Sequence, residues 1–387
     1  MWLELMQGVA AGAALLTLPG SWSLARWTWA ARRPAVSPHL APVTEQILIL
    51  VPAHNEAASL PKTLSALVAQ AQADGRCHVL VIADHCTDDT AQVARAHGAM
   101  VLERQANERG KGHALAAAFA LLPDVPWYLI VDADSTLDPH FLAVLRCKMA
   151  EQPDGIQARY APHCASGDMN APLKHWALQA FNVIRPRGRS ALGEGVGLLG
   201  NGFALSNATL RRVPYRAGSI VEDLEYQLSL ARANCKLAWL EDVAVYGEMP
   251  QGEHAKAQRQ RWEGGRLAMM RSNLWPLIQG IGRGETQLWP ALQDLLLLPL
   301  SQHALLLLLA CSTGGWPLIL GALGILVLIA HAAMALFELP RVMRCRAVLA
   351  APMYIVWKIM QLPHIVRSSR SGASWQRSVR HIEQEKA

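Results

Sequence analysis

Charged side chains are scarce in this sequence of 387 residues, of which Asp, Glu, Lys and Arg make up 17%, against ~25% in ordinary soluble domains. Hydrophobic residues make up 52%. A disordered, collagen-like or coiled-coil protein is excluded, because each needs a polar or strongly periodic composition. The sequence also shows no internal repeat and no low-complexity tract. Its apolar residues therefore either fill a large core or form membrane spans.

Paired cysteines are absent as well. The seven cysteines are odd in number and scattered, and no two form a Cys-x-x-Cys pair. Disulfide-rich secreted domains and structural zinc sites both depend on paired, regularly spaced cysteines. We therefore interpret these residues as reduced cytosolic thiols.

The scarcity of charge is greatest at residues 295–337, which contain no Asp, Glu, Lys or Arg. This run is too long for one helix across a hydrocarbon layer, which takes ~20 residues. The stretch 312–317 (STGGWP) is typical of a turn. Together these features predict two transmembrane helices, about 292–311 and 317–337, within a segment 286–340. The alternative is a buried soluble hairpin, although a soluble core rarely needs helices that are apolar on every face.

A further apolar stretch, about 5–24, predicts a membrane anchor within residues 1–30. Glu4 precedes this stretch and arginines follow it, whereas a cleaved signal peptide carries its positive charge first. Arginine-rich flanks mark the cytoplasmic side of a membrane. Residues 30–290 are therefore predicted to lie in the cytoplasm, in an integral protein of the inner or plasma membrane.

The C-terminal segment 341–387 is also rich in arginine, and we interpret it as an interfacial helix followed by a basic cytoplasmic tail. The apolar stretch 347–363 contains Lys358 and two prolines, which makes it a poor further crossing, although a re-entrant helix or a crossing remains open. The net charge of +6 is explained by arginines that flank the membrane and requires no nucleic acid partner.

The central part of the chain, about 45–285, has short apolar runs that alternate with helical spacing. Strands are predicted at 46–51, 77–83, 100–103 and 127–131, and helices at 57–72, 88–97, 112–122 and 139–151. This alternation predicts right-handed βαβ units and a mainly parallel sheet covered on both faces, an α/β fold. Residues 31–44, which contain three prolines, are interpreted as the linker from the anchor.

Polar motifs follow the predicted strands, where the ligand crevice of such a sheet lies. In chain order they are Pro52 to Glu56 (PAHNE), Ala83 to Thr90 (ADHCTDDT), Arg109 to Leu115 (RGKGHAL), Asp132 to Asp134 (DAD), Glu222-Asp223, and Gln258 to Trp262 (QRQRW).

These residue types suit a nucleoside diphosphate and a divalent cation. Asp132 and Asp134 place two hard oxygen ligands where Mg²⁺ or Mn²⁺ can bind together with substrate phosphates. Lys111, between glycines at the start of a helix, suits the phosphate charge. Asp223 is a separate carboxylate that suits a general base, and Arg261 beside an indole suits a phosphate and a sugar face.

The ordered series of motifs resembles the family-2 glycosyltransferases with a GT-A fold, a Rossmann-like nucleotide-diphospho-sugar transferase fold. It is most similar to their membrane-embedded branch, which includes cellulose, chitin, hyaluronan and poly-N-acetylglucosamine synthases. The resemblance covers about 46–270 and the tail 352–380. One Asp-x-Asp pair is common in loops, whereas the whole series is specific. The chain has Val221 where these synthases have threonine before Glu-Asp, and both carboxylates are kept.

The resemblance implies roles for these residues. The donor pocket would comprise Pro52, Asn55, Glu56, Asp84 and Lys111, with Asp84 at the base and Lys111 near the diphosphate. The metal and sugar nucleotide would be held by Asp132 and Asp134, with Asp134 the more direct ligand. Asp223 would be the catalytic base, with Glu222 beside it in the substrate site. The acceptor and diphosphate-stabilising motif would comprise Gln258, Arg261 and Trp262.

By the same resemblance, the chain would be a membrane-bound inverting hexosyl- or N-acetylhexosaminyl-transferase. It would move a sugar from a nucleotide-diphosphate sugar to a polysaccharide or lipid-linked acceptor in cell-envelope or exopolysaccharide biosynthesis. Three spans are too few for a channel that passes a growing polymer. This predicts either a single transfer to a polyprenyl-linked acceptor or a partnership with a second subunit or copy.

Alternatives remain open at this point. A polyprenyl-phosphate sugar synthase would resemble the first half of the domain, but such relatives generally lack Gln-x-x-Arg-Trp. A non-catalytic sugar-nucleotide-binding subunit of a polysaccharide secretion complex is a second alternative. Residues 195–200 match the dinucleotide pattern Gly-x-Gly-x-x-Gly, but no predicted strand precedes them, so we interpret them as a flexible loop near the acceptor.

Overall fold

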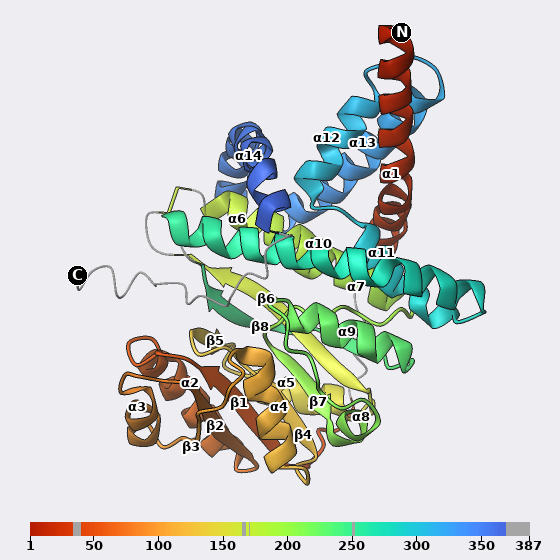
Figure 1. Ribbon diagram of the computed structural model, residues 1–387. Coiled ribbons are helices and arrows are strands. Elements are labelled where there is room, and N and C mark those ends of the chain that lie inside the picture. Colours follow the sequence, from red (N-terminus) through yellow and green to blue (C-terminus); the bar gives the residue numbers. More distant parts are fainter. Residues whose placement is uncertain (34–39, 165–167, 170, 250–251, 369–387) are drawn as a thin grey trace. The chain divides into compact units, whose positions relative to one another are not determined.

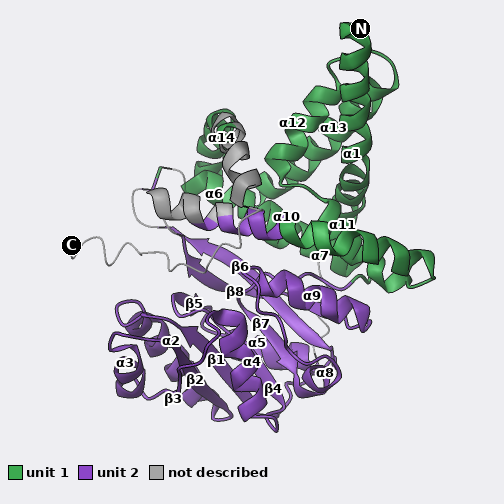
Figure 2. Cartoon of the chain, in the orientation of Figure 1, with its two compact units in different colours: residues 1–35, 169–194, 268–367 green, residues 36–168, 195–267, 368–387 purple. Residues whose placement is uncertain are grey.

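The computed structural model describes residues 1–33, 40–164, 168–169, 171–249 and 252–368 (Figure 1). The chain divides into two compact units (Figure 2). The helical unit comprises residues 1–35, 169–194 and 268–367, and the sheet unit comprises 36–168, 195–267 and 368–387. Part of the predicted linker (34–39) and most of the predicted basic tail (369–387) lie outside the described residues.

The sheet unit contains one eight-stranded sheet in the order β3-β2-β1-β4-β7-β6-β8-β5. The strands are β1 (Ile47–Ala53), β2 (Cys77–Asp84), β3 (Met100–Arg104), β4 (Trp127–Ile130), β5 (Ser135–Leu137), β6 (Gly155–His163), β7 (Phe203–Ser206) and β8 (Leu237–Glu248). The helices that begin in it are α2 (Leu60–Asp74), α3 (Thr90–Ala96), α4 (Lys111–Leu121), α5 (Phe141–Met149), α8 (Asn207–Arg212), α9 (Glu222–Arg232) and α10 (Gly252–Gly282).

The α/β alternation predicted for the first half is confirmed. Strands β3, β2, β1 and β4 are parallel neighbours. The second half is mixed, because β7 is antiparallel to β4 and β6, and β5 is antiparallel to β8, while β6 and β8 are parallel. The prediction of a mainly parallel sheet is therefore confirmed, with only β7 and β5 running against the other strands. Buried strands consist of continuous apolar runs in either direction, so their composition did not reveal this reversal.

One layer of the core of the sheet unit lies against α2 and α5. Alternate residues of β1, such as Ile49 and Val51, pack with Leu64 of α2 and with Phe141 and Leu145 of α5. Helix α4 contacts β1 and β2 through its own buried side chains. Strands β2 and β3 lie on one side of β1 in the sheet, whereas β4 lies on its other side. Right-handed crossovers therefore place α4 on the face opposite α2.

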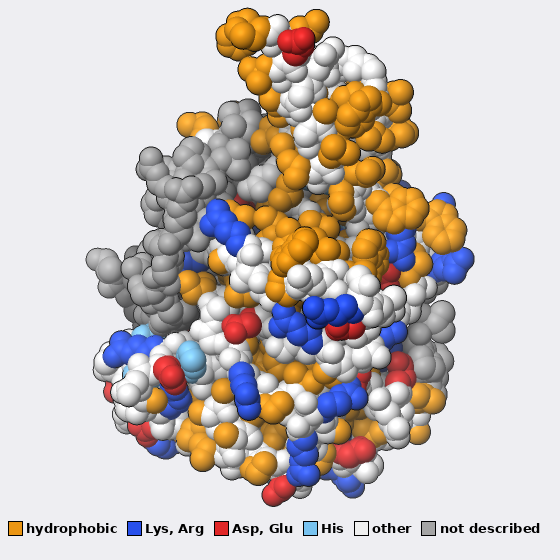
Figure 3. Space-filling view, turned by 45° about the vertical axis from the view of Figure 1, so that its right-hand side comes forward, with side chains coloured by type: hydrophobic (Ala, Val, Ile, Leu, Met, Phe, Trp, Pro, Cys, Tyr) orange, Lys and Arg blue, Asp and Glu red, His pale blue; other side chains and the backbone are white. Residues whose placement is uncertain are grey.

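The helical unit is built from α1 (Trp2–Ala30), α6 (Ala171–Gln179), α7 (Arg185–Ala191), α11 (Trp289–Leu296), α12 (Leu300–Ala310), α13 (Trp316–Phe337) and α14 (Arg341–Ser368). Small side chains, Ala13, Ala14 and Ala310, bring α1 and α12 together. Large apolar side chains such as Leu16 and Leu326 are exposed, and Figure 3 shows hydrophobic side chains gathered on the surface of these helices. Helices α1 and α13 are long and apolar enough to cross a membrane.

The predicted span 292–311 is not one straight helix. Residues 286–296 and 300–310 form two helical stretches that are bent by 81° at the break between them. Pro299 stands at the start of α12, where its missing N–H and fixed φ interrupt the preceding helix. By length and composition, this pair could form a broken span or a re-entrant loop. The predicted stretch 347–363 lies within the single helix α14.

A buried ion-pair cluster joins three helices of the helical unit. Asp294 of α11 accepts hydrogen bonds from Arg185, at 3.0 Å, and from Arg189, both on α7. The two guanidinium groups also lie over the ring of Trp27 of α1. Gly188 makes this approach of α7 to α1 possible, because a Cβ there would overlap the carbonyl oxygen of Trp27. The polar stretch 185–190 is therefore part of the packing between helices.

Candidate active site

The carboxylates that follow β4 meet the lysine that begins α4. The Lys111 ammonium donates to Asp132 Oδ1 at 2.5 Å and to the carbonyl oxygen of Gly200. The Asp134 carboxylate accepts from the Ser135 hydroxyl at 3.2 Å. The structure thus brings Lys111 into contact with Asp132, and Asp134 follows two residues further along the same loop.

The catalytic candidates Glu222 and Asp223 are the first residues of α9. Glu222 Oε1 lies 3.9 Å from the Lys111 ammonium, and Asp223 Oδ1 accepts from the backbone N–H of Leu224 at 2.8 Å. Three carboxylates from two elements, those of Asp132, Glu222 and Asp223, therefore surround one ammonium group.

Burial and charge shift the titration of this cluster. Burial lowers the pKa of Lys111, but the carboxylates of Asp132, Glu222 and Asp223 outweigh it, so that the pKa is raised overall. Burial also raises the pKa of Asp223. The pKa of Glu222 is raised to about 8, mainly by burial and further by Asp223, against the opposing effect of Lys111. The ammonium is therefore charged at neutral pH, and the pair Glu222 and Asp223 loses its protons at higher pH than ordinary carboxyl groups do.

This shift predicts a pH-dependent effect of Glu222→Gln on stability. The unfolded carboxyl loses its proton above its ordinary pKa of 4.5, whereas the folded one keeps it up to about 8. The side chain therefore costs stability that grows as the pH rises between these values. We expect Glu222→Gln to leave stability unchanged near pH 4 and to raise it by roughly 1–3 kcal/mol near pH 8.

Thermal unfolding followed by circular dichroism at several pH values measures this difference. Glu103→Gln is the matched control, because the Glu103 carboxylate is exposed in its pair with Arg95. The raised pKa of Glu222 is contradicted if the midpoint of thermal unfolding of Glu222→Gln differs from that of wild type by the same amount at pH 4 and at pH 8.

The loop 195–200, predicted to be flexible, contains no helix or strand and is held by hydrogen bonds. The backbone N–H groups of Leu198 and Leu199 donate to the side-chain oxygens of Gln227 and Gln157 at 3.1 and 2.9 Å. Gly200 has a φ of +80°, and a Cβ there would lie 3.1 Å from Asp223 Oδ2. The loop therefore borders the proposed base.

The loops after β1 and β2 are joined by polar contacts. Asn55 has a φ of +55°, and its Oδ1 accepts from the backbone N–H of Thr87 at 2.7 Å. Glu56 is buried, and its carboxylate accepts from the Ser59 hydroxyl at 2.6 Å. Pro52 lies in β1 itself, opposite Ile82 of β2. The residues assigned to the nucleotide pocket thus form one edge of the sheet.

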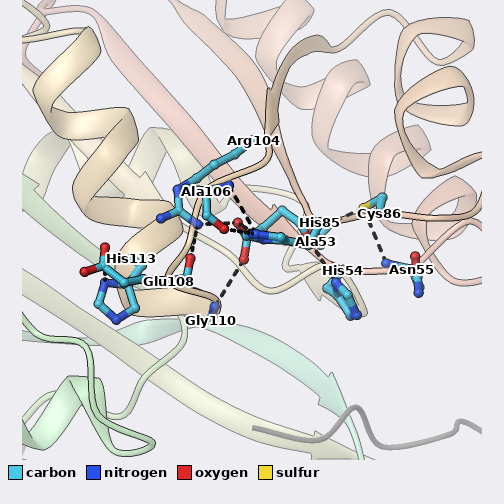
Figure 4. Close-up of polar contacts among 11 residues, drawn as sticks. Ala53, His54, Asn55, His85, Cys86, Arg104, Ala106, Glu108, Gly110 and His113 are labelled. Carbon is cyan, nitrogen blue, oxygen red and sulfur yellow. Dashed lines mark hydrogen bonds and ion pairs between the residues drawn. The ribbon is translucent and has the colours of Figure 1, made fainter.

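Three residues bind Asp84 at the end of β2, and Figure 4 labels these residues, which are His85, Arg104 and Gly110. Its Oδ1 accepts from Arg104 at 2.6 Å and lies 3.0 Å from His85 Nδ1. Its Oδ2 accepts from the backbone N–H of Gly110 at 3.1 Å. Because Gly110 directly precedes Lys111, Asp84 anchors the turn that carries the lysine. No local pattern in the sequence predicted this contact.

The residues predicted to form the acceptor motif lie on α10. Gln258 and Arg261 are partly buried and Trp262 is exposed, and burial lowers the pKa of Arg261. A Cβ at Gly265, one turn further on, would lie 2.7 Å from the Val221 side chain. Helix α10 therefore packs beside the residue that precedes Glu222 and Asp223.

Several residues near Asp132 received no role from the sequence, although the polar motif at 200–202 was recognised there. The backbone N–H of Asp132 donates to the buried Asn201 side chain at 3.1 Å, and Asn201 Nδ2 donates to the Ser135 hydroxyl at 2.8 Å. Gln157 donates to the carbonyl of Asn201 at 2.8 Å. Burial, together with Asp132, raises the pKa of Tyr160. The Gly-Asn-Gly motif at 200–202 was a visible signal for Asn201, whereas Gln157 and Tyr160 stand in an ordinary strand pattern.

The carboxylates after β4 fit a divalent cation that also binds oxygen atoms of the substrate. Among the described residues, no group of three or more His, Cys, Asp or Glu side chains is arranged to hold a metal ion. Asp132 and Asp134 supply two carboxylates from one turn, with the Asp132 side chain one-third exposed. Mg²⁺ and Mn²⁺ bind through one or two carboxylates together with phosphates and waters, so this incomplete set suits such a cation.

Known proteins share both the sequence pattern and the fold. The profile of a family described as "Glycosyltransferase like family 2" matches residues 45–265. Uncharacterized glycosyltransferases of Mycobacterium tuberculosis and Mycobacterium bovis are 32% identical over 118 residues, which is 30% of this chain and 50% of theirs. The chain thus spans about half the length of the curated relatives that it matches.

A solved structure resembles a larger part of the chain. It is the mannosyltransferase PcManGT from Pyrobaculum calidifontis in complex with GDP-Man and Mn²⁺. The similarity covers 92% of this chain and 98% of that one, with a TM-score of 0.53 and 18% identity. At this identity the likeness concerns the fold alone.

Proposed function

Because this chain belongs to the glycosyltransferase-like family 2, we propose that it transfers a sugar from a nucleotide-diphosphate sugar to an acceptor hydroxyl with inversion. The observation that carries the proposal is the cluster of Lys111, Asp132, Glu222 and Asp223 at the end of β4. This cluster combines a cation for phosphate, carboxylates for a metal and a separate carboxylate for a proton. The sugar-nucleotide donor and the acceptor are therefore expected to bind on either side of this cluster.

Asp223 is the proposed base. It takes the proton from the acceptor hydroxyl as that oxygen bonds to the anomeric carbon and the bond from this carbon to the diphosphate breaks. Two adjacent buried carboxyl groups titrate as a pair. A proton on Glu222 therefore leaves the negative charge to Asp223, as a base requires.

The leaving diphosphate requires positive charge. Lys111 at the start of α4 supplies it on one side, and Arg261 of α10 is proposed to supply it on the other. Asp132 and Asp134 would hold Mg²⁺ or Mn²⁺, which when bound supplies further charge stabilisation to the departing phosphates. The mannosyltransferase PcManGT was solved with Mn²⁺, which supports this choice of cation.

Asp84 remains the proposed contact to the nucleobase. Because its carboxylate already binds Arg104 and the N–H of Gly110, it would serve the donor in two ways. It would contact the base and hold the turn that carries Lys111.

The apolar helices support a membrane-bound enzyme with the sheet unit on the cytoplasmic side. Helices α1 and α13 have the length and composition of spans, and the bent pair α11–α12 would add a third. A bundle this small leaves no room for a polymer channel, so we favour a single transfer to a polyprenyl-linked acceptor at the membrane surface. We also propose that the chain is related to the membrane-embedded polysaccharide synthases. A partnership with a second subunit or copy is part of the same proposal.

A donor screen tests the proposal. Full-length protein purified in detergent is incubated with UDP- and GDP-linked hexoses and N-acetylhexosamines, and release of nucleoside diphosphate is scored with and without Mn²⁺. We expect metal-dependent release from one donor class and loss of release in Asp134→Asn. If no donor is consumed with Mg²⁺ or Mn²⁺ present, the chain is a non-catalytic binding subunit.

A further inference from the structure

The ammonium of Lys111 occupies the carboxylate that the proposed metal needs. Its Nζ lies 2.5 Å from Asp132 Oδ1 and also donates to the carbonyl of Gly200. Glu222 Oε1 stands 3.9 Å away on the other side. An oxygen cage of this kind, made of carboxylates and a carbonyl, is one that a cation fills.

We propose that Lys111 is a placeholder for the divalent cation. Without donor, its ammonium neutralises Asp132, and an arriving diphosphate draws the ammonium away and releases Asp132 to the metal. The inference rests on the proposed function, in which Asp132 and Asp134 hold that metal. It makes Lys111 a positioning residue that sets the order of binding, with donor first and metal second or both together.

Repulsion between like charges is the physical cause. A metal ion that bonds to Asp132 beside the ammonium would place two cations on one carboxylate in a partly buried site, where water screens them weakly. The metal must therefore displace the ammonium from Asp132 Oδ1 and from Gly200 before it binds. The ammonium then loses both contacts, and this loss requires compensation.

The diphosphate supplies the compensation. Lys111 is the first residue of the eleven-residue helix α4, where free backbone N–H groups favour phosphate oxygens. Its flexible stem lets the ammonium turn from a carboxylate to a phosphate without movement of the backbone. Gly110 before it adopts a φ of +121° and is held by Asp84, so the turn itself stays in place.

Mn²⁺ binding without donor tests the proposal. Free Mn²⁺ is measured by electron paramagnetic resonance in titrations of the purified full chain, alone and with UDP or GDP. We expect weak donor-free binding by wild type, and about tenfold tighter donor-free binding by Lys111→Met. Since metal–phosphate bonds also couple the two ligands, the donor-free affinity of the variant is the decisive value.

Two control variants separate the placeholder from a general effect of lost charge. Lys111→Arg keeps a cation at the site and should bind donor-free Mn²⁺ as weakly as wild type. Lys62→Met removes a lysine–carboxylate contact with Glu248 elsewhere in the sheet unit. Its donor-free affinity for Mn²⁺ should also equal that of wild type. Lys111→Gln replaces Lys111→Met if the latter does not fold, as judged by thermal unfolding.

The outcomes distinguish this inference from the function on which it rests. Unchanged donor-free affinity in Lys111→Met, or the same gain in Lys111→Arg, overturns the placeholder alone. Absence of Mn²⁺ binding in wild type even with UDP and GDP, or binding that survives Asp134→Asn, overturns the metal assignment and the placeholder with it. A gain confined to Lys111→Met and Lys111→Gln supports both.

Discussion

Replacement of Asp223 by asparagine is expected to reduce sugar transfer roughly 10³-fold or more, because an amide cannot take the acceptor proton. Donor affinity should change little, since the proposed donor contacts are made by Lys111 and by the loops after β1 and β2. The carboxylate is partly buried and borders Gly200, and asparagine replaces it with almost no change in volume. Turnover of the preferred donor and donor binding by calorimetry are measured on the same preparation.

Asp124→Asn is the matched control for this variant. Its carboxylate is 91% exposed in a pair with Arg211, and the substitution should leave both turnover and binding at the wild-type level. An Asp223→Asn enzyme that retains more than about a tenth of the wild-type rate would overturn the assignment of the base, because general-base contributions are ~10²–10⁴-fold.

The second large effect is expected from Gly112→Ala. A Cβ at this position would overlap the backbone carbonyl oxygen of Ala217 and lie 3.2 Å from Glu222 Cβ. A backbone atom cannot rotate aside, so α4 and the segment before α9 must move apart. We expect a loss of ~3 kcal/mol in stability, and about 100-fold lower transfer because Lys111 separates from the catalytic pair.

Gly282→Ala provides the comparison for a glycine in a helix with open space around it. There the added methyl group should change stability by no more than ~1 kcal/mol, in the favourable direction. Chemical denaturation and turnover are compared for the two variants. If Gly112→Ala behaves like Gly282→Ala, the close approach of α4 to residue 217 is not a feature of the folded protein.

The first half of the sheet unit was accessible from the sequence because its signals are local. Apolar runs such as 47–51 and 127–130 end directly in polar motifs, and parallel strands bring those motifs to one edge. The structure places Asp132 against Lys111 as this argument requires. The roles of the individual residues remain proposals, which the experiments above address.

Other features depend on contacts between distant residues and left no local pattern. The bend at Pro299 was not evident, because a proline in an apolar run is also compatible with a continuous span. The pairing of Asp294 with Arg185 and Arg189 joins residues more than 100 positions apart. The antiparallel placement of β7 and the bonds of Asp84 to Arg104 and Gly110 likewise appear only once the chain is folded.

The central claim is that this chain transfers a sugar from a nucleotide donor to an acceptor at the membrane. Its most direct test is incubation of radiolabelled donor with membranes that contain either the wild-type chain or Asp223→Asn. The account predicts a labelled product in the lipid extract that forms with wild type and Mn²⁺ and is absent with the variant. Label that remains in the donor or appears only as free sugar, equally in both membranes, would contradict it.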